Sequence, residues 1–172
     1  MPQQKNLTMK KTLLILTFVC LGITNSNAQV VGIDIGDIAP EIDLPNTKGE
    51  TVSLSSLRGS LVLIDVWATW CGPCMKEQPE LLKLYSLYPD KLSIYGVSLD
   101  NKKANWVAAV TKMKQPWSQV SDLKYWSSPF VADYMIQALP FNMLIDKNGI
   151  IFAKNIHGSA LNEMVKSLLT AQ

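Results

Sequence analysis

The sequence predicts one α/β domain with a mixed central sheet flanked by helices. Short apolar runs that suit buried strands alternate with helical patterns over residues 61–113. The dipeptide Asn148-Gly149 is a strong reversal signal and adds an antiparallel hairpin to the parallel strands. A length of 172 residues suits one core, and 48% hydrophobic with 17% charged residues is typical of a globular chain.

Residues 1–28 have the features of a secretory signal peptide. Lys10 and Lys11 precede an uncharged run over residues 12–23, and Ser26-Asn27-Ala28 places small side chains where a signal peptidase reads. We expect cleavage after Ala28, export to the periplasm or cell envelope, and a folded domain over residues 29–172.

Two alternatives remain for this segment, a retained membrane anchor and lipid attachment at Cys20. The apolar run of about a dozen residues is short of the roughly 20 that span a bilayer, which disfavours an anchor. Bulky Phe18 and Val19 precede Cys20 and disfavour lipid attachment. The start of translation also remains open, since Met9 gives a more compact signal than Met1.

Removal of residues 1–28 changes both the charge and the cysteine count. Three lysines leave and no acid does, so 13 of the 16 basic residues remain against 14 acidic ones. The net charge becomes about −1, and we therefore expect no nucleic acid as a partner. Of the three cysteines the mature chain keeps Cys71 and Cys74.

The close pair Cys71 and Cys74 indicates redox chemistry. A bridge between them closes a loop too small to restrict the unfolded chain much, so a stapling role is disfavoured. Structural zinc would need four ligands, and the mature chain offers only the two cysteines and a distant His157. We therefore expect no metal and no cofactor, and we interpret His157 as structural or incidental.

The pair lies between a predicted strand and a predicted helix. Residues 61–68 form an apolar run typical of a buried central strand. Residues 75–88 have a helical pattern that Pro79 should kink, with one apolar face formed by Leu81, Leu82, Leu84 and Tyr85.

This placement gives the two cysteines different roles. At a helix N-terminus, unpaired backbone N–H groups and the helix dipole stabilise the thiolate of Cys71, which is the attacking form. Cys74 lies about one turn further in, more sheltered, and suits the release of a mixed disulfide. Pro73 fits a first helical turn, and Gly72 leaves space above the sulfur for a partner.

The rest of the chain completes the alternation. We expect a second parallel strand at 93–99, a hairpin turning at 146–149, and helices at 102–113, 130–136 and 161–169. Residues 29–40 are interpreted as an extended lead-in and 101–129 as an insertion of helix plus loop. We interpret the three tryptophans of the insertion as packing residues rather than a ligand cage: Trp106, Trp117 and Trp126.

Three segments together resemble a known family. The block Trp67-Ala68-Thr69-Trp70-Cys71-Gly72-Pro73-Cys74 resembles the active site of the thioredoxin superfamily, in the version of its exported TlpA/ResA-like branch. Residues 40–59 resemble the N-terminal β-hairpin that this branch shares with peroxiredoxins. Leu139-Pro140 and the residues through Gly149 resemble the family's cis-proline strand and hairpin. The resemblance implies a thioredoxin fold with an added N-terminal β-hairpin.

The resemblance also implies a substrate-binding surface. Its members would be Trp70, Gly72, Pro73, Leu139 and Pro140. Pro140 would follow a cis peptide bond and face the disulfide, exposing neighbouring backbone to a partner's extended chain.

Two acidic residues are further candidates for the catalytic site. Asp65 matches the buried acid of thioredoxin that assists proton transfer at the resolving cysteine; the alternative is a solvent-exposed carboxylate at a strand edge. Its apolar neighbours Ile64 and Val66 favour burial. Glu77 matches a glutamate that shapes the site in ResA-like proteins, and equally suits a first-turn acid that stabilises a helix N-terminus.

The resemblance indicates a direction of electron flow and partners. Gly-Pro between the cysteines resembles thioredoxin, a reductant at about −270 mV, more than the oxidant DsbA at about −120 mV. A reductase outside the cytoplasm needs electrons from a membrane thiol-electron donor of the DsbD/CcdA type. Its partners would be disulfide-containing proteins. The substrates would be either apocytochrome c cysteines awaiting haem or oxidised thiols more generally, and the sequence does not choose between the two.

Two other functional classes remain as alternatives. A peroxiredoxin-like peroxidase would carry Pro-x-x-x-Thr-x-x-Cys, but the matching positions before Cys71 are Ile64 and Ala68. A non-catalytic binding module could keep the fold for docking, and the intact Cys71, Cys74 and Pro140 count against it.

Overall fold

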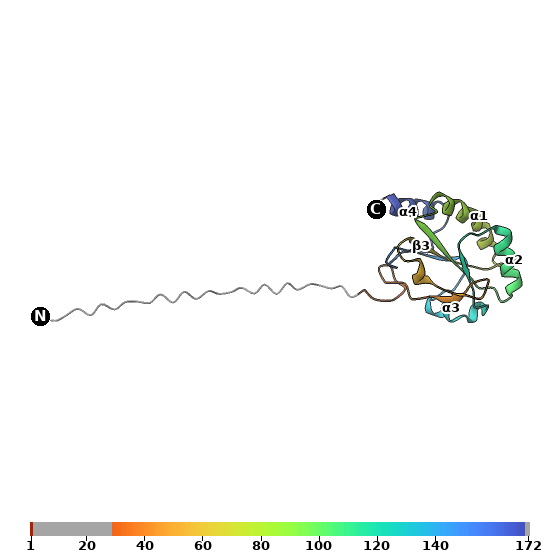
Figure 1. The fold of residues 1–172 in the computed structure, drawn as a ribbon, viewed down its shortest axis with the longest axis horizontal. Helices are drawn as coiled ribbons and strands as arrows, with labels where there is room; N and C mark the ends of the chain where they lie inside the picture. Colours follow the sequence, from red (N-terminus) through yellow and green to blue (C-terminus); the bar gives the residue numbers. More distant parts are fainter. Residues whose placement is uncertain (2–28, 171–172) are drawn as a thin grey trace.

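A five-stranded mixed sheet lies at the centre of the fold (Figure 1). The computed structural model describes Met1 and residues 29–170, so the expected signal peptide lies outside the described residues except for its first. The strands follow the order β5-β4-β3-β6-β7, with β4 and β5 parallel to β3 and β6 antiparallel to it. Their bounds are β3 Leu61–Trp67, β4 Leu92–Ser98, β5 Ser118–Val120, β6 Phe141–Ile145 and β7 Ile151–Lys154.

The central strand and the predicted N-terminal hairpin are both confirmed. Every residue of β3 is buried, as its apolar run predicts. A separate antiparallel pair, β1 Asp43–Pro45 and β2 Thr51–Ser53, precedes it and leads into a short 3₁₀ helix, η1 Leu54–Leu57. The described part of the chain therefore has the predicted thioredoxin fold with an added hairpin.

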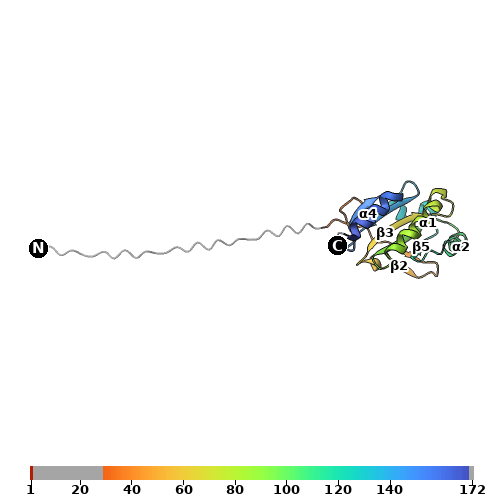
Figure 2. The same cartoon turned by 90° about the horizontal axis from the view of Figure 1, so that it is seen from above.

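Helices cover the two faces of the sheet. On one face α1 Gly72–Leu87 and α4 Gly158–Thr170 lie side by side (Figure 2). Their buried leucine and valine side chains form one core cluster with Leu63 of β3. The other face is covered by the N-terminal hairpin, by α3 Pro129–Asp133 and by Trp106 of α2 Lys103–Met113. Trp106 and Trp117 are buried, so their interpretation as packing residues is confirmed.

Helix α1 begins three residues earlier than its apolar pattern predicts. Pro73 occupies the first turn, where its missing N–H has no intrahelical partner, and Cys71 is the N-cap. Cys74 therefore lies within the helix. The helix continues through Pro79 to Leu87 and buries Leu81 and Leu84.

Two predictions about irregular segments are wrong. Residues 29–40 do not form an extended lead-in, because an isolated bridge joins Val31 to Ile38 and a turn with Gly36 at φ +97° folds the segment back. Residues 101–129 contain the expected helix but also the edge strand β5, together with the 3₁₀ helix η2 Tyr125–Ser127. Strand β5 was not predicted because it has only three residues with a polar one at its centre, which is too short a pattern to indicate a strand.

The hairpin between β6 and β7 turns where the sequence predicts. The Asp146 carboxylate accepts the backbone N–H groups of Asn148 and Ile150, both at 2.8 Å. Gly149 has φ +92°, and a Cβ there would lie 2.3 Å from the Arg58 guanidinium carbon. The positive φ favours glycine at this position, and a larger residue would also have to displace the Arg58 side chain.

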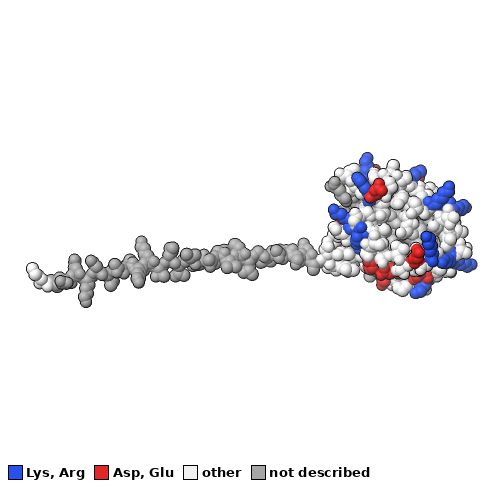
Figure 3. All heavy atoms as spheres, viewed as in Figure 1, with Lys and Arg blue, Asp and Glu red and all other residues white. Residues whose placement is uncertain are grey.

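The surface of the described domain carries mixed charge. Basic and acidic side chains are interspersed on the face shown in Figure 3. Within residues 29–170, none of the helices combines the length and apolar character that crossing a membrane requires.

Candidate active site

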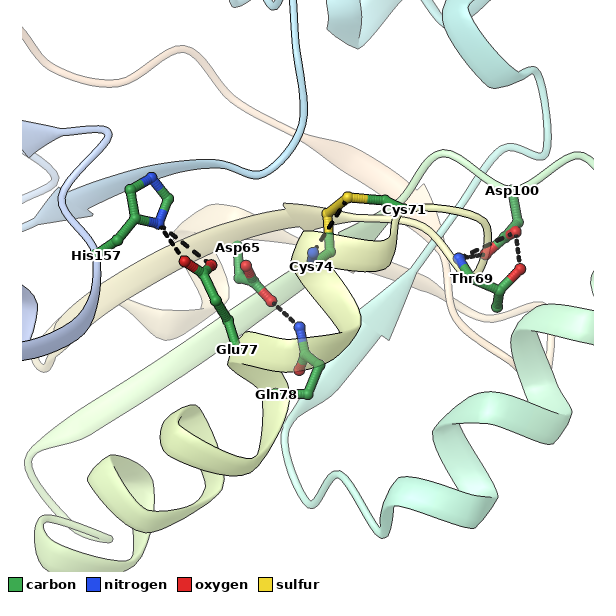
Figure 4. Close-up of a disulfide and its surroundings, with 8 residues drawn as sticks. All are labelled: Asp65, Thr69, Cys71, Cys74, Glu77, Gln78, Asp100 and His157. Atoms are coloured by element: carbon green, nitrogen blue, oxygen red, sulfur yellow. Dashed lines mark hydrogen bonds and ion pairs between the residues drawn. A yellow bond between two sulfur atoms is a disulfide. The ribbon is translucent and has the colours of Figure 1, made fainter.

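Cys71 and Cys74 form a disulfide at the N-terminus of α1 (Figure 4). Their Cα atoms are 5.3 Å apart, and the backbone N–H of Cys74 donates a hydrogen bond of 3.2 Å to the Cys71 sulfur. Cys71 has extended backbone and ends the loop after β3, so its sulfur meets the positive end of the helix. Such a position stabilises a thiolate once the disulfide is reduced.

The surface around the disulfide is open on the Cys71 side. Cys71 is 6% exposed and Cys74 only 1%. A Cβ added to Gly72 would meet no described atom within 4 Å, and Pro73 is exposed beside it. Trp70 is 45% exposed. The three residues that the sequence assigns to substrate contact on this side therefore lie at the surface.

An aromatic cluster extends this surface. The Trp70 ring lies 5.0 Å from that of Tyr125 and 6.2 Å from that of Trp126, measured between centroids. Tyr125 is 39% exposed and Trp126 half-buried. Trp126 is thus a packing residue, as predicted, and it packs against the side chain beside Cys71.

The peptide bond between Leu139 and Pro140 is cis, as the resemblance implies. Phe141, the first residue of β6, pairs with Val66 near the C-terminal end of β3. Pro140 therefore lies at the end of the sheet where the chain leaves β3 and continues to Cys71. Leu139 is half-buried against the core cluster that contains both cysteines. Contact of these two residues with a substrate stays a prediction.

Asp65 lies in the middle of β3 and is 3% exposed, which confirms its predicted burial. Its Oδ2 accepts a hydrogen bond of 3.0 Å from Nε2 of Gln78. The pKa of Asp65 is raised from 3.8 to about 6, chiefly because burial disfavours the charged form; the Gln78 hydrogen bond and His157 act to lower it, and Glu77 acts to raise it. A carboxyl with this pKa can accept a proton near neutral pH.

Gln78 belongs to a buried amide chain that sequence reasoning missed. Its Oε1 accepts a hydrogen bond of 2.6 Å from Nε2 of Gln115, and both side chains are buried. The sequence spacing could have indicated this role. Gln78 lies four residues after Cys74, so on a helix that contains both residues the Gln78 side chain lies on the same face as Cys74.

Glu77 contacts His157, the residue that the sequence leaves without a partner. Its Oε1 and Oε2 lie 2.9 and 3.2 Å from the His157 Nδ1. Because α1 begins at Gly72, Glu77 lies in the second turn, so its interpretation as a first-turn acid is wrong. Of the two interpretations of His157, structural or incidental, the incidental one is wrong, because the connection from β7 to α4 brings His157 onto α1 (Figure 4).

Asn142 fixes the segment that carries His157. It lies opposite Asp65 in the pairing of β3 with β6. Its amide accepts the Ile156 N–H at 3.1 Å, donates to the Ile156 carbonyl at 2.7 Å and lies 3.3 Å from His157 Nδ1. Asp65 on β3 and Asn142 on β6 are neighbours, and Asn142 holds the segment that carries His157. Asp65 and His157 therefore lie on the same side of α1.

A cavity of about 140 Å³ joins these groups. Asp65, Glu77, Asn142 and His157 contribute its polar wall. Its apolar wall includes Leu81 of α1 and Leu161 of α4. The cavity therefore connects the buried Asp65 carboxylate with the Glu77–His157 pair.

Asp100 stabilises, through hydrogen bonds, the loop between β3 and α1, on the other side of the disulfide. Its buried carboxylate accepts the Thr69 N–H at 3.1 Å, the Thr69 hydroxyl at 2.6 Å and the Ser98 hydroxyl at 2.8 Å. This residue was not identified from the sequence. It follows β4, the parallel neighbour of β3, and the carboxyl ends of such strands meet at one edge of the sheet.

Comparison with known proteins gives a consistent assignment. The AhpC/TSA family matches residues 35–154. Thioredoxin-like protein YneN of Bacillus subtilis is 30% identical over 90% of this chain and 94% of its own. Thiol-disulfide oxidoreductase ResA of Geobacillus thermodenitrificans is 30% identical over 98% and 97%.

A solved structure extends the likeness to the fold. The thioredoxin domain of a thiol-disulfide oxidoreductase from Bacteroides vulgatus superimposes with a TM-score of 0.74 at 36% identity. The match covers 80% of this chain and 99% of the other. The chain therefore belongs to the AhpC/TSA family within the thioredoxin superfamily and is a thiol-disulfide oxidoreductase of the TlpA/ResA-like type.

Proposed function

We propose that the protein is an exported reductase of protein disulfides that cycles Cys71 and Cys74 between dithiol and disulfide. The main support for this proposal is the arrangement of the two cysteines. They form a disulfide at a helix N-terminus, with Cys71 toward an open surface and Cys74 sheltered. A buried carboxyl, Asp65, lies on the adjoining strand with its pKa raised to about 6. These positions support the assignment of attack to Cys71, release to Cys74 and proton transfer to Asp65.

The cycle begins with attack by the Cys71 thiolate on a substrate disulfide. One substrate thiolate leaves, and a mixed disulfide joins Cys71 to the substrate. Cys74 then gives its proton to Asp65 and attacks the Cys71 sulfur, so the second substrate thiolate leaves. Two electrons have passed to the substrate, and the protein holds the Cys71–Cys74 disulfide.

The nucleophile assignment predicts unequal labelling of the two cysteines. In the reduced protein at mildly acidic pH, Cys71 should alkylate several times faster than Cys74, because it is the N-cap and the more exposed. Mass spectrometry of peptides after a short pulse of iodoacetamide measures both rates. Equal labelling, or faster labelling of Cys74, contradicts the assignment.

The direction of electron flow rests on the Gly-Pro dipeptide between the cysteines. We expect a reduction potential near that of thioredoxin, about −270 mV, and far below the roughly −120 mV of DsbA. Equilibration with dithiothreitol buffers, followed by alkylation and mass analysis, measures it. A value near −120 mV would make the protein an oxidase and overturn the proposal.

Export and partners complete the proposal. The signal-like pattern of residues 1–28 supports action in the periplasm or cell envelope. There the cycle needs electrons from a membrane donor of the DsbD/CcdA type. The resemblance of the active-site block to the TlpA/ResA-like branch supports substrates that include apocytochrome c cysteines.

A peroxidase is the less supported function. The positions that would carry proline and threonine in its signature hold Ile64 and Ala68, and both are fully buried in the core. Neither supplies a hydroxyl to a peroxide at Cys71.

A further inference from the structure

Asp65 has two neighbouring routes by which a proton could leave it. One is the amide chain through Gln78 and Gln115. Gln78 already donates to the Asp65 carboxylate, and amide groups do not titrate near neutral pH, so this route orients Asp65 but carries no proton away. The other is the cavity shared with Glu77 and His157.

The cavity leads from a buried group to the surface. Asp65 is 3% exposed, whereas the side chains of Glu77 and His157 are each 31% exposed. A cavity of about 140 Å³ has room for water molecules, each of which occupies about 30 Å³ in the liquid. Its wall supplies the several polar partners that such water needs.

The charged groups that face the cavity are few. Helix α1 contributes Lys76, Glu77 and Glu80, the segment before α4 contributes His157, and β6 contributes only the neutral Asn142. Lys76 and Glu80 are exposed, and Glu80 pairs with Lys83 at 2.8 Å. Glu77 and His157 pair with each other at 2.9 Å and are half-buried. Histidine is the side chain that exchanges protons most readily near neutral pH.

We propose that this cavity is the proton path of the exchange reaction and that His157, held by Glu77, is the group through which Asp65 exchanges protons with solvent. The inference rests on the proposed function. After Cys74 has given its proton to Asp65, the Asp65 carboxylic acid passes it to water in the cavity, and the water passes it to the His157 imidazole. The imidazolium beside the Glu77 carboxylate then releases it to solvent. No electrons move in these steps, and they reverse when the protein is reduced.

His157→Ala tests the path through the rate of disulfide resolution. Reduced protein is mixed with dithiobis-nitrobenzoate in a stopped-flow instrument; Cys71 releases the first thionitrobenzoate and the attack of Cys74 releases the second. At low buffer concentration the second phase of His157→Ala should be about tenfold slower than that of the wild type. Added imidazole should restore the rate, because it can enter the space left by the side chain and carry the proton.

Two further variants separate proton transfer from structure. His157→Gln keeps a side chain in place but cannot titrate, so it should be slow and should not respond to imidazole. Glu80→Gln is the matched control, a neutralised acid at the same cavity that should resolve at the wild-type rate. The proposed path is overturned if His157→Ala resolves the mixed disulfide at the wild-type rate. It is also overturned if His157→Ala is slow and added imidazole does not raise its rate.

Asp65→Asn in the same assay distinguishes the two proposals. If the wild type releases no second thionitrobenzoate, the dithiol cycle itself fails. If Asp65→Asn resolves as fast as the wild type, the proton role of Asp65 fails and the path fails with it. If Asp65→Asn is slow and His157→Ala is fast, the cycle stands and only the path is overturned.

Discussion

Cys74→Ala is expected to hold the protein on its substrates as stable mixed disulfides. Cys74 lies 5.3 Å from Cys71 between Cα atoms, so its attack on the mixed disulfide is intramolecular. Well-placed intramolecular groups act as if present at about 10⁵ M or more, whereas an external thiol is present at about 1 mM. The ratio of these two concentrations is about 10⁸, so loss of Cys74 should slow substrate release by at least about a thousandfold even if only a small part of that ratio is realised.

Cells that produce the variant allow the measurement. After acid quenching and alkylation, non-reducing gels of Cys74→Ala should show covalent complexes that reductant removes. Cys71→Ala, produced as residues 29–172, is the matched control and should capture nothing, because the cysteine that remains, Cys74, is the sheltered one. If folded Cys74→Ala forms no complexes, the chain is a binding module and not a reductase.

The local parts of this arrangement could be predicted from the sequence. The run 61–68 is apolar throughout, and the pair Cys71 and Cys74 follows it directly, so strand, loop and helix are neighbours along the chain. Burial of Asp65 follows from the same run, because a strand covered on both faces buries all its side chains. These inferences need no contact between distant segments.

The parts that were missed depend on such contacts. His157 meets Glu77 only because β6 and β7 pair and return the chain to α1, a contact across 80 residues of sequence. Strand β5 is short and polar, and it is fixed by pairing with β4 and by a hydrogen bond from Trp67 to Gln119. A local pattern cannot reveal either feature, since tertiary pairing decides both.

Asp65→Asn is expected to change the pH dependence of stability in the oxidised protein. The folded pKa of about 6 exceeds the value of 3.8 taken for the unfolded chain, so the folded state binds the proton more tightly. The wild-type free energy of unfolding should therefore fall as pH rises from about 4 to about 6, by roughly 3 kcal/mol for about two pKa units, and stay low above that. Asparagine keeps an oxygen that accepts the Gln78 hydrogen bond and carries no charge, so the variant should lack this fall.

Denaturant unfolding at several pH values measures the effect. At pH 7 Asp65→Asn should be more stable than the wild type by up to roughly 3 kcal/mol, and the two should converge below about pH 4. Asp100→Asn is the matched control, because Asp100 is equally buried but accepts hydrogen bonds from Thr69 and Ser98. It should lose stability at pH 7, since an amide cannot accept all of them.

The same Asp65→Asn variant should be slow in catalysis although it is more stable. Without the carboxylate, Cys74 must give its proton directly to solvent from a position that is 1% exposed. Loss of a positioned general base typically slows a reaction by a factor of about 10² or more. The rate at which the second thionitrobenzoate is released should therefore fall about a hundredfold. A merely structural Asp65 would alter stability and leave this rate alone. If the rate is unchanged across roughly pH 6 to 8, where a base with a pKa near 6 acts, Cys74 loses its proton to another group.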